Sequence, residues 1–167
     1  RPVSVVASYL NGDVSDSGVA IPLDGHKRVE VHPNGRYVVS ASLKELSLFA
    51  RDPETGELSF LESEATYGDH ITTAFSHDGR SFYVLRHYIN IYSQSELRHY
   101  RIEQDSLELV DQIVIPKITG VVSAINEQPQ IFQYQSDTMR MVLPEDGKQL
   151  YLGTALTGII IFDRDVD

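Results

Sequence analysis

The stretch Thr73–Val84, which reads TAFSHDGRSFYV, decides the fold of this chain. A short apolar strand runs into the Asp78-Gly79 pair, and a second apolar strand follows directly. Asp-Gly and Asn-Gly pairs favour the tight turns that join two antiparallel strands. The stretch therefore predicts a β-hairpin.

The same hairpin pattern occurs twice more, around Pro33-Asn34-Gly35-Arg36 and around Glu145-Asp146-Gly147-Lys148. In each copy a third apolar strand follows the hairpin. Gly35 and Gly79 are 44 residues apart, which is the length of one four-stranded propeller blade. The repeats predict an all-β chain of β-propeller blades, about three in number, each a four-stranded antiparallel sheet.

The repeat divides the chain into five predicted parts. They are residues 1–25 as two strands of a preceding blade, 26–63 as a blade, 64–113 as a second blade, 114–137 as an inserted hairpin and 138–167 as a partial blade. A propeller ring usually needs at least about four blades to close. We therefore expect that this chain is a segment of a longer propeller or that a second chain completes the ring.

Composition and charge exclude several classes of partner. The chain has 24 acidic and 14 basic residues and a net charge of −10, which disfavours nucleic acid as a partner. No apolar run approaches the roughly 20 residues that a membrane-spanning helix needs. The absence of cysteine excludes disulfides and thiol chemistry, and it is compatible with an oxidising compartment.

Two segments carry a family resemblance. Phe49–Leu58 (FARDPETGEL) and Phe75–Val84 (FSHDGRSFYV) resemble the blades of lactonase-like bacterial β-propellers with Tyr-Val-Thr-Asn repeats. The resemblance covers most of residues 3–113 and 139–165 and implies a fold like that of 6-phosphogluconolactonase. Such repeats occur in secreted surface proteins, periplasmic binding propellers and sugar-lactone hydrolases, which implies an extracellular or periplasmic location. The resemblance assigns no catalytic residue, so the catalytic residues stay unknown.

The connections between strands point to one face of the blades as functional. On one face the predicted turns are short and regular, whereas on the other the connections 62–70, 86–95 and 115–137 are long and varied. Binding residues concentrate on loops that a rigid scaffold holds in place. We call the face with the long connections the loop face and the other the turn face.

One connection of the loop face is rich in polar and aromatic groups. Arg86 could contact an anion and His87 could carry a proton near neutral pH, with Tyr88 and Asn90 as further ligand contacts. In the alternative interpretation Tyr88 and Tyr92 cover a sheet edge and the polar groups are solvated.

A second candidate is the pair Asp69 and His70, which has a counterpart at Gly25-His26. An Asp beside a His could orient the ring for acid–base chemistry or contribute to a metal site. The recurrence at successive blade junctions favours a structural role instead. Asp163–Asp167 superficially resembles a calcium loop, but the repeat explains it better as a strand connection. We predict no metal and no cofactor.

The insertion predicts an interaction surface. Residues 121–125 and 131–134 read as two apolar strands of an extra hairpin on the loop face. A hairpin this apolar should pack against the channel mouth or a partner. Tyr134 is therefore a further candidate ligand contact.

Two functions from different classes follow. The first is a noncatalytic extracellular or periplasmic propeller domain that binds a protein or a saccharide through its loop face. The second is part of a lactonase-like hydrolase, in which a carboxylate activates water and Arg86 with a histidine holds the lactone.

Overall fold

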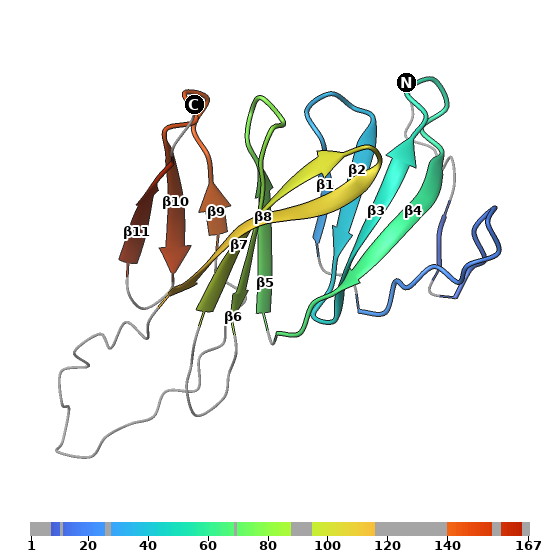
Figure 1. Cartoon of the computed structure of the whole chain (residues 1–167), viewed down its shortest axis with the longest axis horizontal. Helices are drawn as coiled ribbons and strands as arrows, with labels where there is room; N and C mark the ends of the chain where they lie inside the picture. The colour runs from blue at the N-terminus through green and yellow to red at the C-terminus, as the bar shows by residue number, and fades with distance from the viewer. Residues whose placement is uncertain are drawn as a thin grey trace, which may run out of the picture.

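The computed structural model describes residues 8–10, 12–25, 28–68, 70–87, 95–115, 140–154 and 158–164. These residues form eleven strands in three antiparallel sheets, shown in Figure 1. The all-β fold class that the repeats predicted is confirmed. No helix in these ranges could cross a membrane.

Each sheet is built from strands in chain order. The first contains β1 (Arg28–Val31), β2 (Tyr37–Ala41), β3 (Glu45–Arg51) and β4 (Leu58–Ala65). The second contains β5 (His70–Phe75), β6 (Phe82–His87), β7 (Ser95–Glu103) and β8 (Ser106–Ile115). The third contains β9 (Arg140–Val142), β10 (Gln149–Thr154) and β11 (Gly158–Asp163).

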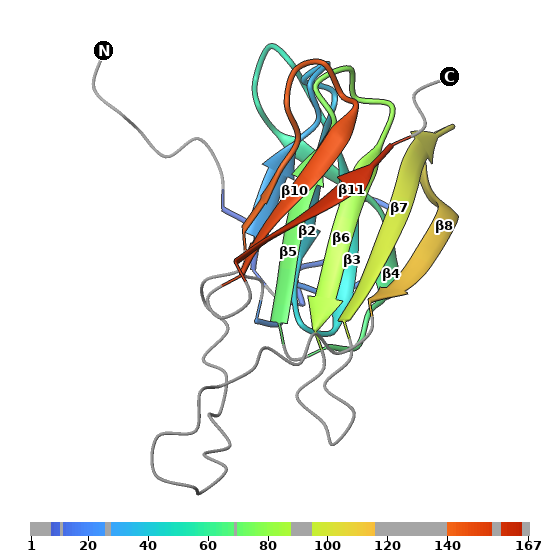
Figure 2. The same cartoon turned by 90° about the vertical axis from the view of Figure 1, so that its left-hand side faces the viewer.

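The three sheets stand side by side like the blades of a wheel. The first strands of successive sheets lie next to each other, because β1 contacts β5 and β5 contacts β9. Figure 1 shows the three sheets in a row, and Figure 2 shows the same row turned by 90°. First strands that follow one another in this way face a common axis, as in a propeller.

The amino-terminal region contributes to the first sheet without a strand of its own in its described part. Residues 12–25 contain one isolated bridge, between Val14 and Ala20. Ile21 packs against Val38 and Phe49 on the outer face of the first sheet. Residues 3–7 and the predicted hairpin of 121–134 lie outside the described residues. The division of the chain into five parts therefore stays a prediction.

The core lies in the seams between sheets, because each strand sends alternate side chains to opposite faces. On β6, Phe82 and Val84 pack with Leu46 and Leu48 of the first sheet. Their neighbours Tyr83 and Leu85 pack with residues of the third sheet, Leu150 and Leu152 among them. The central part of β6 is therefore apolar on both faces.

The three Asn-Gly and Asp-Gly turns share one backbone conformation but differ in how the glycine carbonyl is bound. Gly35, Gly79 and Gly147 have φ angles of 73°, 73° and 65°. In the first and third sheets an arginine at the end of the third strand, or directly after it, donates to the glycine carbonyl: Arg51 Nη1 to Gly35 O at 3.0 Å, and Arg164 Nη1 to Gly147 O at 2.6 Å.

The turn of the second sheet takes its donor from the neighbouring sheet. His32 Nε2, at the end of β1, lies 2.9 Å from Gly79 O. The position that corresponds to Arg51 is Ile102, which has no donor to offer. The His32 contact therefore ties the first sheet to the second at the turn face.

Candidate functional site

The loop-face end of the second sheet brings two predicted site residues together. The antiparallel register of β5 and β6 places His70 directly opposite His87. Their backbones are thus neighbours although 17 positions separate them in the sequence. Four other predicted site residues, Asp69, Tyr88, Asn90 and Tyr134, lie outside the described residues.

Arg86 differs from the expectation of a residue in a loop. It lies within β6, because the pairing of β6 with β7 continues to His87 and Ser95. Its side chain is 4% exposed, and Nη2 lies 3.1 Å from Glu96 Oε1 on β7. Strand periodicity gives Arg86 the same face as Phe82 and Val84, which is the face that packs on the first sheet. The guanidinium is therefore part of a seam.

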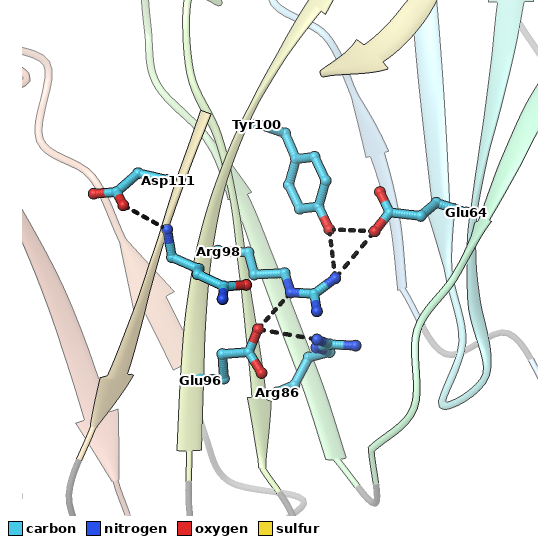
Figure 3. A network of polar contacts seen from close by, with 7 residues as sticks. Glu64, Arg86, Glu96, Arg98, Tyr100 and Asp111 are labelled. Carbon is cyan, nitrogen blue, oxygen red and sulfur yellow. Dashed lines mark hydrogen bonds and ion pairs between the residues drawn. The ribbon is translucent and has the colours of Figure 1, made fainter. Parts of the chain in front are cut away.

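Arg86 belongs to a polar network that crosses this seam, shown in Figure 3. Arg98 Nε donates to Glu96 Oε1 at 2.5 Å, and Arg98 Nη1 donates to Glu64 Oε1 on β4 at 3.0 Å. Tyr100 completes the network by donating its hydroxyl to Glu64 Oε1 at 3.0 Å. Two guanidinium groups and two carboxylates give the network no net charge.

Glu96 and Tyr100 each keep one protonation state near neutral pH. Burial raises the pKa of Glu96, but its hydrogen bonds and ion pairs with Arg98 and Arg86 outweigh burial and leave the pKa below its usual value. Burial raises the pKa of Tyr100 to about 12; Arg98 opposes this rise and Glu64 adds to it. Neither shift brings the pKa of Glu96 or Tyr100 close to 7. The network is therefore suited to holding two sheets together rather than to moving protons.

The carboxylate of Glu30, near the common axis, has a raised pKa, whereas that of Glu96 is lowered. Glu30 lies on β1, and its Oε1 accepts a hydrogen bond of 3.3 Å from Thr73 Oγ1 on β5. Burial raises the pKa of Glu30, and the Thr73 bond and the charge of Arg28 only partly oppose this. The pKa of Glu30 is thus raised, whereas the pKa values of Asp52, Asp78 and Glu96 are lowered. A carboxylate with a raised pKa is suited to acid–base chemistry.

Arg86 is the one member of this network that was predicted as a site residue, although the sequence carries a signal for its partners. Glu96, Arg98 and Tyr100 alternate along β7, so that they share one face of the strand. Polar residues at every second position of a strand indicate a polar seam. Across the described ranges, no group of three or more His, Cys, Asp or Glu residues could hold a metal ion.

Radial antiparallel sheets whose first strands line a common axis define this chain as part of a β-propeller. Its fold is that of the lactonase-like propellers, as comparison with solved structures shows. No protein-family model matches the sequence, and no curated protein sequence is similar to it.

Three solved structures illustrate the match. A Bacteroides fragilis protein, provisionally described as a 6-phosphogluconolactonase, has a TM-score of 0.59 and 16% identity over 87% of this chain and 36% of its own. A Lactobacillus plantarum protein has a TM-score of 0.58 and 19% identity over 92% of this chain and 44% of its own. The periplasmic gluconolactonase of Pseudomonas aeruginosa has a TM-score of 0.56 and 17% identity over 91% of this chain and 39% of its own.

These matches establish the fold alone. Identities of 16–19% are too low to carry residue roles from one protein to another. The chain spans 36–44% of the length of these structures, so the described sheets correspond to part of a ring.

Proposed function

We propose that this chain is part of a noncatalytic extracellular or periplasmic propeller that binds a protein or a saccharide at its loop face. The opposed positions of His70 and His87 at that end of the second sheet carry the proposal. Polar residues at the ends of strands are held more rigidly than loop residues and suit a binding site. Asp69, Tyr88, Asn90 and Tyr134 are the further proposed contacts.

The state of Arg86 favours binding over hydrolysis. A lactone hydrolase must stabilise the negative charge that develops on the lactone oxygen, and Arg86 was the predicted cation. Its guanidinium is almost fully buried and is paired with Glu96 in a network without net charge. The carbonyl of a substrate would have to compete with that carboxylate. The cation is therefore better explained as part of the seam.

Binding of saccharides can be tested by isothermal titration of the complete protein with a panel of mono- and oligosaccharides. Binding of a protein can be tested by affinity capture from an extracellular protein fraction, followed by identification of the captured protein. Replacing both His70 and His87 by alanine should weaken binding by about tenfold or more, because polar contacts are lost. His77→Ala is the matched control, since His77 lies in the turn at the opposite end of the sheet. Equal effects of the two variants would contradict the proposal.

A lactone hydrolase is the second candidate, and Glu30 is the observation that favours it. Its raised pKa and its place on an inner strand suit a general base at the axis. Hydrolysis of glucono-1,5-lactone, followed by titration of the released acid at constant pH, tests this candidate. Turnover above the spontaneous rate that Glu30→Gln abolishes would establish the hydrolase and overturn the noncatalytic proposal.

A further inference from the structure

A cleft on the turn face lies between the first and second sheets. Its volume is about 520 Å³, within the range of small-molecule sites. The walls come from the β1–β2 turn, the β5–β6 turn and the end of β7. All four strands of each of these two sheets are described, so the cleft lies between two complete sheets. The cleft lies at the opposite end of the sheets from His70 and His87.

One wall of the cleft is fixed through His32. Because Gly79 O can only accept, His32 Nε2 must carry the proton in their 2.9 Å hydrogen bond. The backbone N–H of Asn34 donates to His32 Nδ1 at 3.1 Å, which requires a lone pair there. The ring is therefore held at both nitrogens. Its orientation in the wall is set before any ligand arrives.

The facing wall is held by the turn between β7 and β8. Gln104 and Asp105 have φ angles of 50° and 64°, a conformation that residues other than glycine rarely adopt. Tyr37 donates its hydroxyl to Asp105 Oδ1 at 2.7 Å and so links this turn to the first sheet. Figure 1 shows the tip of the β7–β8 hairpin beside the first sheet. A two-residue hairpin turn of type I′ requires a positive φ at both central positions, so this conformation belongs to the turn itself.

The lining of the cleft decides the chemistry of the ligand. Asp78 and Glu103 supply carboxylates, whereas Arg80 and Arg101 supply guanidinium groups. The ion pairs found in the described part of the chain involve none of these four residues. An anion would meet the two carboxylates, and a cation would meet the two guanidinium groups. A neutral ligand that both donates and accepts hydrogen bonds avoids both conflicts.

We propose that this cleft binds a neutral saccharide of one or two rings. Sugar hydroxyls can donate to the carboxylates and accept from the guanidinium groups and from the amide of Asn34. Tyr37 and His32 supply aromatic surface for the apolar C–H face of a sugar ring. The site is independent of the loop-face proposal, since the two share no residue.

The test is a titration of the isotope-labelled complete protein with maltose, cellobiose and N-acetylglucosamine, followed by amide chemical shifts. Binding at the cleft should move the amide signals of Asn34, Gly79 and Gln104. Arg80→Ala should weaken the affinity about fivefold or more, which is the loss of one hydrogen bond to a charged group. Tyr37→Phe should also weaken it, because the β7–β8 turn loses its link to the first sheet.

Lys148→Ala is the matched control, because Lys148 takes the place of Arg80 in the third turn and lies outside the cleft. It should leave the affinity unchanged. The proposal is overturned if none of the sugars shifts these amides, if inorganic phosphate binds there instead, or if Arg80→Ala and Lys148→Ala act alike. Shifts confined to His70 and His87 and insensitive to Arg80→Ala would overturn it while supporting the loop-face proposal.

Discussion

At the scale of single residues, two turn glycines with the same backbone angle have different surroundings. Gly35 and Gly79 both have φ of 73°. A Cβ added at Gly35 would lie 3.8 Å from Arg51 Nη1, which is ordinary contact. A Cβ at Gly79 would lie 2.9 Å from His32 Nε2 and closer still to Cε1. The second glycine is therefore required by the neighbouring sheet as well as by its own turn.

This difference gives the first prediction. Gly35→Ala should lower the free energy of unfolding by about 1–2 kcal/mol, the cost of a left-handed alanine. Gly79→Ala should lower it by about 1–3 kcal/mol more, because the imidazole must move. Urea denaturation measures both losses. Equal losses in the two variants would contradict the His32 contact, and His32→Ala in the Gly79→Ala background should recover part of the difference.

At the scale of strands and sheets, the turns made the fold predictable. A positive φ at Gly79 follows from the Asp-Gly pair, and apolar strands on both sides leave little choice but an antiparallel hairpin. The spacing of Gly35 and Gly79 then gives the four-stranded repeat. Local chemistry of this kind is visible in a single sequence.

The site was less predictable, because it depends on partners that are distant in the chain. Arg86 was expected in a loop, but β6 continues past Val84, and its partner Glu96 is ten positions away. The contact of Arg98 with Glu64 joins residues of two sheets. Such pairs follow from how the sheets are placed side by side, which periodicity within one strand does not reveal.

The polar network predicts how stability depends on acid. Burial raises the pKa of Glu96, but its bonds to Arg98 and Arg86 leave that pKa lowered in the folded state. The stabilisation is therefore complete above the unfolded pKa of about 4.5 and is lost as the pH falls through the folded pKa.

Glu96→Gln should remove this part of the acid dependence. It should also lower the free energy of unfolding at neutral pH by about 2–3 kcal/mol, because both arginines lose their shared carboxylate inside a partly solvated seam. Glu108→Gln on the exposed part of β8 is the control and should change little. Urea unfolding at a series of pH values measures both effects. Identical acid profiles for Glu96→Gln and the wild type would contradict the role of the network.

The seam between the second and third sheets predicts a different pH response. His99 Nε2 lies 2.9 Å from Ser81 Oγ, which also accepts from Arg164 Nη2 at 3.0 Å. Burial lowers the pKa of His99, and the charges of Arg101 and Arg164 lower it further against the opposing charge of Asp111. The unfolded chain therefore binds this proton more tightly. Stability should fall as the pH drops below about 6.5 and level off below the folded pKa.

Replacing His99 by glutamine removes the titrating group and keeps a polar side chain beside Ser81. Thermal unfolding between about pH 7 and pH 5 should then show a smaller loss of stability than in the wild type. His77→Gln is the control, since the His77 side chain is 70% exposed in the turn. If His99→Gln leaves the pH profile as steep as before, the His99–Ser81 contact does not control the seam.

At the scale of the whole molecule, both outer sheets carry large apolar side chains that are mostly exposed. Val142, Ile159 and Ile161 are 57%, 71% and 56% exposed on one face of the third sheet. At the other end of the row, Val29 and Val31 of β1 are 65% and 54% exposed. In the second sheet, by contrast, β6 buries apolar side chains on both of its faces. A sheet with an exposed apolar face is stabilised when another sheet or segment packs against that face.

The isolated 167-residue chain should therefore associate in solution. Light scattering at several concentrations should give an average mass above that of the monomer. Ile159→Thr combined with Ile161→Thr should lower this mass, since threonine preserves the strand and removes apolar surface. Val14→Thr is the control, because Val14 is similarly exposed but does not belong to the third sheet. A monomer at every concentration would contradict the prediction.

The histidine that reaches across to Gly79 also limits how such a chain can evolve. In the first and third units the donor, Arg51 or Arg164, belongs to the same unit as the turn that it binds. Duplication of either unit would therefore copy the turn together with its donor. The second unit inherits its donor from the unit before it. Recombination that moved it behind a unit without a histidine at that position would leave a carbonyl unbound. The turn of the second unit therefore depends on which unit precedes it.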